Sequence, residues 1–256
     1  MLERYSDRPL QGQTVLVTGA SGGIGAAIVE RLALEGARPI IHYCHDVAAA
    51  EALLSRIGGH GFVVQADLSD AEGSCELWRE AVAFAGRIHS VVNNAGIVTE
   101  ISIESSAAAW KTAWQKEFQL NLFAAADLCR EAIRHFLTEG GGRIVNMASQ
   151  AGQRGSAADI LPHGATKAAL INLTKSIASS FGREGVMAVS IAPGLVRTEM
   201  AEKYIAHDEE ETVDTIPIGD MTEPAEIAEL VAFVLRYSQE SLNGATLDVN
   251  GGSYIR

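Results

Sequence analysis

Two side chains capable of acid–base chemistry stand four residues apart in the segment LPHGATKAAL, residues 161–170. The Ala-rich composition around His163 and Lys167 predicts a helix. On a helix, residues at i and i+4 share one face, so the imidazole and the ammonium point the same way. A histidine with an ordinary pKa of about 6.5 exchanges protons at neutral pH. The pair is therefore a candidate for general acid–base catalysis.

A glycine-rich turn offers a second chemistry, the binding of a phosphate. The segment TGASGGIG, residues 18–25, lies between a β-branched run and a helix-forming stretch. Gly19, Gly23 and Gly25 permit positive φ and close backbone approach, and the N-terminus of a helix presents free N–H groups to an anion. The spacing Gly-x-x-x-Gly-x-Gly differs from the commoner dinucleotide pattern Gly-x-Gly-x-x-Gly. Alone, the segment is also consistent with a plain tight turn.

Two rival interpretations of these residue types are rejected. GASGG also matches Gly-x-Ser-x-Gly, the nucleophile elbow of serine hydrolases. That elbow normally follows several strands, and no acidic residue and histidine lie at convincing later strand ends to complete a triad. His42, Cys44 and His45 are zinc-ligand types, but His45 would face the opposite side of a strand from the other two. We expect no metal site.

The composition limits the partners of the chain. Its 256 residues include 20 Lys and Arg against 32 Asp and Glu, a formal net charge of −12 at pH 7. This charge argues against binding nucleic acids or anionic membranes through bulk electrostatics. The three cysteines form no even framework, the N-terminus has no signal-peptide pattern, and no apolar run approaches a membrane span. We expect a cytoplasmic protein with no nucleic-acid or membrane partner.

Short β-branched runs alternate with longer amphipathic segments, which predicts an α/β fold with a parallel sheet covered by helices on both faces. We expect strands at 14–19, 39–43, 61–67, 89–96, 142–149, 186–194 and 244–252. The expected helices lie at 24–37, 48–59, through the 70s and 80s, and at 107–137, 159–182 and 224–237, the last with Pro224 in its first turn. No linker or repeat divides the chain, so one domain over residues 1–256 is expected.

Further motifs stand at the expected strand ends or on the long helix: ADLSD (66–70), NNAG (93–96), Asn121, Ser149 and APG (192–194). With the glycine turn, they resemble the short-chain dehydrogenase/reductase family, and its 3-oxoacyl-acyl-carrier-protein reductases, from Gln13 to Gly252. The resemblance implies a single-domain Rossmann fold with a doubly wound, seven-stranded parallel sheet. It also implies NAD(P)(H) binding and reversible hydride transfer between the nicotinamide and a small-molecule carbonyl or alcohol.

Positions in the family pattern assign residues to the cofactor. The glycine turn would hold the diphosphate, Asp67 and Leu68 would flank the adenine, and the segment 193–198 would enclose the nicotinamide amide. The residues assigned in this way are Gly19, Ser21, Gly23, Ile24, Gly25, Tyr43, Cys44, His45, Asp67, Leu68, Asn94, Ala95, Gly96, Lys167, Pro193, Gly194, Val196 and Thr198.

The same resemblance makes Ser149, His163, Lys167 and Asn121 the catalytic residues. Ser149 would hydrogen-bond the substrate oxygen, Lys167 would bind the nicotinamide ribose, and Asn121 would support a proton-relay water. Structural interpretations remain open for two of these residues: Asn121, like Asn94, could brace backbone, and Ser149 could cap a turn.

His163 departs from the family, which places a tyrosine four residues before its lysine as the general acid. An imidazole donates a proton at neutral pH without help, but the lysine and the oxidised nicotinamide would disfavour its protonated form. An imidazole nitrogen also falls short of a tyrosine hydroxyl by roughly 2 Å, and about 1 Å of misplacement can cost ~10²-fold in rate. Three interpretations stay open: an altered or slowed reductase, a dinucleotide-binding protein with little redox activity, and a histidine that is not the natural residue.

The end of the second strand favours NADP(H) over NAD(H). The family's NAD-preferring members carry an Asp there that rejects a 2′-phosphate, and this chain has Tyr43. Cys44 and His45 could donate hydrogen bonds to the phosphate. Against this preference, residues 21–23 lack the basic residue of many NADP-preferring members, and Asp46 could still reach a ribose.

The remaining expectations concern the N-terminus, a lid segment, the substrate and the oligomeric state. Residues 1–11 are expected to be a flexible N-terminus, and residues 197–217 a short lid that includes the acidic run at 206–211. A 3-oxoacyl, sugar-like or secondary-alcohol substrate is equally admissible. The helices at 107–137 and 159–182 are apolar on more than one face, so we expect a homo-oligomer, a dimer or tetramer as in the family.

Overall fold

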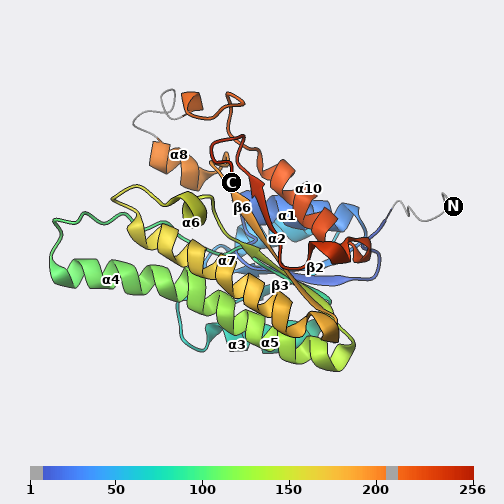
Figure 1. Cartoon of the computed structure of the whole chain (residues 1–256). Helices are drawn as coiled ribbons and strands as arrows, with labels where there is room; N and C mark the ends of the chain where they lie inside the picture. The colour runs from blue at the N-terminus through green and yellow to red at the C-terminus, as the bar shows by residue number, and fades with distance from the viewer. Residues whose placement is uncertain (1–7, 206–212) are drawn as a thin grey trace.

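The computed structural model describes residues 8–205 and 213–256. The acidic run at 206–211 and most of the expected flexible N-terminus lie outside the described residues. The described chain forms one seven-stranded sheet in the order β3-β2-β1-β4-β5-β6-β7, and all its pairings are parallel. Helices cover both faces (Figure 1). The predicted doubly wound Rossmann fold is confirmed.

The order of the strands fixes where a ligand binds. The strands are β1 (Thr14–Val17), β2 (Arg38–Tyr43), β3 (Phe62–Gln65), β4 (Ser90–Asn93), β5 (Gly142–Met147), β6 (Val186–Pro193) and β7 (Thr246–Val249). After β1 the chain builds β2 and β3 towards one edge and then returns to pair β4 with the other side of β1. Open α/β sheets bind ligands outside the carboxyl ends of their strands at such a reversal. The glycine turn after β1 and the NNAG segment at the end of β4 flank this point.

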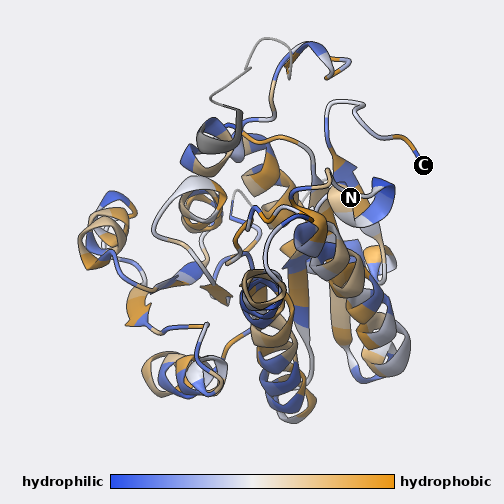
Figure 2. Cartoon of the chain, turned by 90° about the vertical axis from the view of Figure 1, so that its left-hand side faces the viewer, coloured by the Kyte–Doolittle hydropathy of each residue, from blue (hydrophilic) through white to orange (hydrophobic). Residues whose placement is uncertain are grey.

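The helices form one layer on each face of the sheet. The first layer consists of α1 (Gly23–Leu34), α2 (Val47–Arg56) and α10 (Pro224–Leu235), which share a core cluster with the strands. The second consists of α3 (Gly73–Ala85), α5 (Ala124–Glu139) and α7 (Leu161–Phe181), with a second cluster. The helices carry both hydrophilic and hydrophobic stretches in Figure 2, as expected for elements with one face on the sheet and one in solvent.

The helix predicted at 107–137 is three elements. It comprises α4 (Ala107–Phe118), a π-helical turn, η1 (Gln119–Phe123), and α5. A π-turn admits one extra residue without ending the helix, so the apolar periodicity continues across it and gives no sign of the break. Asn121 lies inside the π-turn and is 1% exposed. Such turns occur frequently at functional sites.

The other differences are small. The structure adds the short helices α6 (Ala151–Arg154) and α8 (Glu199–Ile205), and the 3₁₀ turns η2 (Gly182–Glu184) and η3 (Tyr237–Leu242). One or two helical turns contain too few residues for a period to be recognised. The predicted first-turn position of Pro224 is confirmed. Within 8–205 and 213–256, no helix combines the length and the apolar character needed to cross a bilayer.

Candidate active site

The glycine turn after β1 has a backbone that only glycine accommodates. Gly19 and Gly23 have φ values of 61° and 53°. A Cβ at Gly25 would lie 2.3 Å from the carbonyl oxygen of Gly19 and 2.7 Å from Nδ2 of Asn94. Both distances are far below van der Waals contact, so a side chain at this position would displace the turn. The backbone at the start of α1 can therefore be approached closely by a ligand.

The first turn of α1 carries no capping side chain. Its N-cap is Gly22, which has no side chain to accept a hydrogen bond. The N–H groups of the first helical turn have no intrahelical partner, and here they sit with the positive end of the helix dipole at the switch point of the sheet. This arrangement suits a phosphate or diphosphate.

Hydrogen bonds from neighbouring strands hold the turn in place. The backbone N–H groups of Asn94 and Ala95 each donate to Oγ1 of Thr18 at 2.9 Å. Nδ2 of Asn94 donates to the carbonyl oxygens of Thr18 and Gly19 at 2.9 and 3.1 Å. The Asn94 side chain thus braces backbone, the structural interpretation that the sequence left open.

His42 supports the same turn and was missed as a functional residue. The Gly19 N–H donates to its Nδ1 at 3.0 Å, and its Nε2 lies 3.1 Å from the carbonyl oxygen of Ala66. Nδ1 must therefore accept, and Nε2 carries the hydrogen. Burial lowers the pKa of His42 to about 4, so the ring is neutral. Both nitrogens are engaged within the protein, and His42 ties the glycine turn to β2 and β3.

The ends of β2 and β3 bring together the residues assigned to the adenosine side. Tyr43 is 9% exposed, and Sγ of Cys44 lies 3.5 Å from Nε2 of His45. Oδ1 of Asp67 accepts from the hydroxyl and the N–H of Ser69 at 2.7 and 2.8 Å, and these bonds lower the pKa of Asp67. An ionised carboxylate therefore stands at this end of the sheet.

Two further residues of this region have structural roles. Asp46, which the sequence left as a possible ribose ligand, caps the N-terminus of α2, where its Oδ1 accepts from the Ala49 N–H at 2.9 Å. Leu68 is 3% exposed and belongs to the core cluster on the α3 face.

Lys167 lies buried beneath the NNAG segment. Its Nζ donates to the carbonyl oxygen of Met147 at 2.7 Å, and the residue is 6% exposed. Burial lowers the pKa of Lys167 to about 8, partly offset by the charge of Glu117. A Cβ at Gly96 would come within 3.5 Å of this Nζ and 3.1 Å of Oδ1 of Asn121. The glycine keeps space open beside both polar groups.

Asn121 joins the π-turn to the loop after β4. Its Oδ1 accepts from the N–H of Ile97 at 2.8 Å, and its Nδ2 donates to the carbonyl oxygen of Ile97 at 2.9 Å and to Oε1 of Glu117 at 2.8 Å. These bonds brace the loop that carries Gly96. They are the structural role left open for Asn121, and they fix its side chain beside Lys167.

His163 faces a buried carboxylate that sequence reasoning missed. Its Nδ1 lies 3.2 Å from Oε1 of Glu117 and 3.3 Å from the carbonyl oxygen of Ile97. The Glu117 side chain is fully buried, and that of His163 is 14% exposed. Glu117 stands four residues before Asn121, a spacing that places both on one helical face. This four-residue spacing is the sequence feature that could have identified Glu117 as part of the site.

Ser149 and the segment after β6 complete the same end of the sheet. Oγ of Ser149 accepts from the N–H of Ala151, the first residue of α6, at 3.1 Å. A Cβ at Gly194 would lie 2.8 Å from Cβ of Asn250, and one at Gly23 would lie 3.4 Å from Cγ2 of Thr198. The segment from Pro193 through the 6%-exposed Val196 to Thr198 therefore reaches back to the glycine turn.

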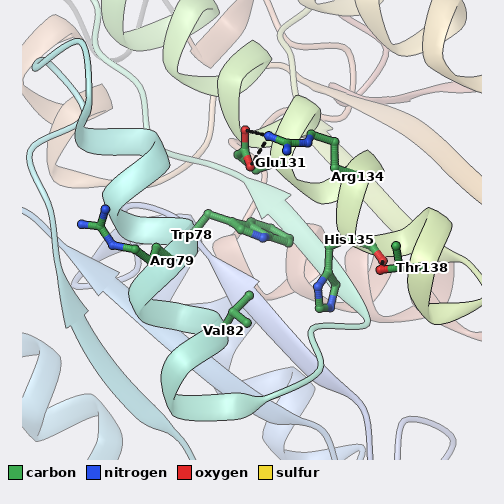
Figure 3. A pocket seen from close by; sticks show the side chains of 7 residues that line it. All are labelled: Trp78, Arg79, Val82, Glu131, Arg134, His135 and Thr138. Atoms are coloured by element: carbon green, nitrogen blue, oxygen red, sulfur yellow. Dashed lines mark hydrogen bonds and ion pairs between the residues drawn. The ribbon is translucent and has the colours of Figure 1, made fainter.

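A groove of about 430 Å³ lies elsewhere, between α3 and α5 (Figure 3). It is lined by Trp78, Arg79, Val82, Glu131, Arg134, His135 and Thr138. Nε2 of His135 accepts from the backbone N–H of Ile88, just before β4. The groove therefore lies towards the amino ends of the strands, away from the glycine turn and Lys167. Its lining includes none of the residues predicted for the site.

Known proteins resemble the chain along nearly its whole length. Residues 19–254 match the family described as Enoyl-(Acyl carrier protein) reductase. A 3-oxoacyl-acyl-carrier-protein reductase of Staphylococcus aureus is 30% identical over 246 residues, 95% of this chain and 98% of that protein.

Solved structures agree with the sequence matches. A variant of a Serratia marcescens short-chain dehydrogenase/reductase has a TM-score of 0.88 and 32% identity, with 96% of this chain and 99% of that chain covered. A putative NAD(P)-dependent gluconate 5-dehydrogenase of Beutenbergia cavernae with bound NADP has a TM-score of 0.89 and 30% identity, with 97% and 99% covered. The chain belongs to the short-chain dehydrogenase/reductase family of oxidoreductases.

Proposed function

We propose that the chain is an NAD(P)(H)-dependent enzyme that reduces a carbonyl or oxidises a secondary alcohol. The observation that carries this proposal is the juxtaposition of an uncapped helix N-terminus in a glycine turn with a buried lysine and asparagine beside Gly96. The first suits a diphosphate, and the second offers hydrogen bonds to a ribose and a proton path. When bound, the nicotinamide supplies or accepts the hydride.

Each proposed catalytic residue has a task that its position supports. Lys167, held by the Met147 carbonyl, binds the nicotinamide ribose. Ser149 hydrogen-bonds the substrate oxygen at the end of β5. Asn121 holds the loop with Gly96 and supports a relay water. His163, in place of the family's tyrosine, exchanges the proton with the substrate oxygen.

NADP(H) is the proposed cofactor in preference to NAD(H). β2 ends in Tyr43, and the following carboxylate, Asp46, is engaged as the N-cap of α2, so it is not free to bind both ribose hydroxyls. Cys44 and His45, which follow β2, carry donors that suit a 2′-phosphate, and the similar Beutenbergia cavernae structure contains NADP. The ionised Asp67 acts against this preference.

The test is the substitution His163→Tyr, with nicotinamide absorbance followed over a panel of carbonyl substrates. Turnover is expected to fall while nicotinamide binding is retained, because a tyrosine that donates its proton becomes negative beside the buried carboxylate of Glu117. The matched control is His60→Tyr, the same change at an exposed position, which should leave turnover unchanged. A large gain of activity in His163→Tyr would contradict the assignment of His163 as the acid.

A second candidate is a dinucleotide-binding protein with little turnover. It is favoured by the engagement of Nδ1 of His163 with Glu117 and Ile97, because an imidazole held there has less reach than a phenol. This candidate predicts nicotinamide binding, no measurable turnover on the panel, and activity gained on His163→Tyr. The same experiment therefore separates the two functions.

A further inference from the structure

Glu117 is a buried carboxylate in contact with two of the proposed catalytic residues. Its side chain is fully buried, and its Oε1 lies within hydrogen-bond distance of Nδ2 of Asn121 and Nδ1 of His163. Its Oε2 is buried and has no hydrogen-bond partner among the described residues. A carboxylate is costly to bury unless it is paired, so the burial of Glu117 requires a structural or functional explanation.

The neighbours of His163 determine which ring nitrogen holds the hydrogen. Oε1 of Glu117 already accepts from Asn121, and the other neighbour of Nδ1 is the carbonyl oxygen of Ile97. Both neighbours are acceptors, so Nδ1 must donate. Nε2, which makes no hydrogen bond within the described residues, is then the nitrogen left to exchange a proton.

The charges around His163 are few. Glu117 reaches it from α4, and Lys167 stands one turn along its own helix. The adjoining loops carry Glu100, Arg154 and Asp159, all exposed and without a hydrogen bond or ion pair to the ring among the described residues. Among the described residues, Glu117 is therefore the one buried carboxylate in contact with the ring, and its charge also acts on Lys167.

We propose that Glu117 is a positioning residue that holds Nδ1–H of His163 and makes its Nε2 the general acid. This inference rests on the proposed function. In carbonyl reduction the substrate carbon accepts the hydride, and its oxygen takes the proton from Nε2 of the imidazolium. The C=O π bond breaks as the C–H and O–H bonds form. The neutral imidazole keeps its Nδ1–H on Glu117 and regains a proton at Nε2 from water.

A histidine that donates the proton in this site needs a negative charge nearby, whereas a tyrosine does not. A tyrosine becomes negative when it donates its proton, so the adjacent lysine favours its ionisation. A histidine is positive before it donates, so the same lysine opposes the acid form. The carboxylate of Glu117 corrects this imbalance, and it also fixes the ring orientation, as a second partner does for other catalytic imidazoles.

The test titrates His163 by ¹⁵N NMR of the labelled imidazole, in the chain without nicotinamide. In the wild-type protein, Nδ1 should be the protonated nitrogen of the neutral ring. In Glu117→Gln the midpoint of the titration should move to lower pH by about one unit or more, the usual effect of losing an adjacent opposite charge. Glu117→Asp, which keeps the charge, should recover part of the shift. Asp159→Asn, an exposed carboxylate on the loop before His163, should leave the midpoint unchanged.

The outcomes distinguish positioning from a purely structural role. The acid-side midpoint of the kcat/KM profile should move with the NMR midpoint in Glu117→Gln, and Glu117→Gln should cause no such shift when His163→Tyr is already present. An unmoved NMR midpoint, or hydrogen on Nε2 of the neutral wild-type ring, would overturn the inference. If Glu117→Gln fails to fold, the tautomer of the wild-type ring and the titration of Glu117→Asp still test the inference. Because the titration needs no turnover, its failure is distinct from a failure to bind nicotinamide.

Discussion

The hydrogen-bond partners of the two histidines of the site favour opposite tautomers. Nδ1 of His42 accepts from the Gly19 N–H, whereas Nδ1 of His163 faces two acceptor oxygens. Burial lowers the pKa of His42 to about 4, which makes it a neutral brace. His163 has a buried carboxylate beside it. The same residue type therefore supports the backbone in one place and, in the proposed function, exchanges a proton in the other.

Lys167 gives a prediction about stability and pH. Burial lowers its pKa to about 8 from the ordinary value of 10.5. Between these two values the folded chain has released a proton that the unfolded chain still holds, so stability rises with pH in this window. Relative to Lys167→Met, the wild-type protein should gain up to about 3 kcal/mol in free energy of unfolding between pH 7 and pH 10.

Urea unfolding at several pH values measures this difference, because subtracting the variant removes the titration of all other groups. Lys175 is an exposed lysine on the same helix, and Lys175→Met serves as the control with no pH-dependent difference expected. A wild-type minus Lys167→Met difference that stays constant from pH 7 to pH 10 would show that the lysine is not desolvated in the folded chain.

Sequence alone located most of the polar groups of the site but not their partners. Strand ends and family positions put Lys167, Asn121 and Asn94 in one region, and the structure does bring them together. Glu117 was missed because a glutamate within a helix with many polar residues is usually solvent-exposed. Its burial depends on α7 packing against α4, a contact between segments far apart in sequence.

At the scale of elements, the positions of the seven strands were predicted well, although all expected strands except 39–43 extend one to three residues past the observed carboxyl ends. The interior of the long helix was not predicted. The strands are bounded by turn residues, and nearly all residues of β1, β2, β4, β5 and β6 are buried, as in a sheet covered on both faces. The π-turn at Gln119–Phe123 differs from an α-helix by one residue per turn. No local composition signals that difference, and the hydrogen bonds of Asn121 to Ile97, which join the π-turn to the loop after β4, form only in the folded chain.

The turn between β1 and α1 gives a prediction at this scale. Gly25→Ala should weaken nicotinamide binding by tenfold or more, about 1.4 kcal/mol, because its Cβ would lie 2.3 Å from the Gly19 oxygen and displace the turn. Fluorescence titration with NADPH and NADH measures the loss. Gly22→Ala, three residues earlier, is the matched control: its Cβ meets nothing within 4 Å, and its φ is −163°.

The comparison of the two alanine variants isolates the geometry of the turn. Both remove a glycine from the same segment, and only one places a methyl group against backbone. Equal affinities for the two variants would show that the diphosphate is not held by the backbone of this turn. Thermal unfolding of both variants should accompany the titration, so that a loss of fold is not mistaken for a loss of affinity.

At the scale of the whole molecule, the alternation of strands and helices was sufficient to predict the fold class. Each βαβ unit is right-handed by a general rule, so a chain with seven such strands has few topologies available. The sequence pattern says less about the surface of the molecule. An aromatic stripe runs along α4 and the π-turn, formed by Trp110, Trp114, Phe118 and Phe123 with successive ring centroids 5.7, 5.7 and 6.2 Å apart.

The π-turn keeps this stripe continuous. Phe118 and Phe123 are five residues apart, a spacing that an α-helix would place on different faces and a π-turn places on one. Phe123 is 51% exposed at the end of the stripe. Trp110, Trp114 and Phe118 are partly exposed. A row of such rings favours burial against another chain, and we predict that the expected homo-oligomer forms through this surface.

Phe123→Glu should therefore reduce the molar mass measured by size-exclusion chromatography with light scattering, since a charge cannot be buried there without a partner. Phe84→Glu is the matched control: it makes the same change at a phenylalanine that is 56% exposed on α3 and outside the stripe. Its mass should equal that of the wild type. A wild-type mass equal to one chain, or equal losses in both variants, would exclude the stripe as the subunit interface. Because α4 also carries Glu117, assembly through this surface would tie the packing of the proposed acid–base pair to the oligomeric state.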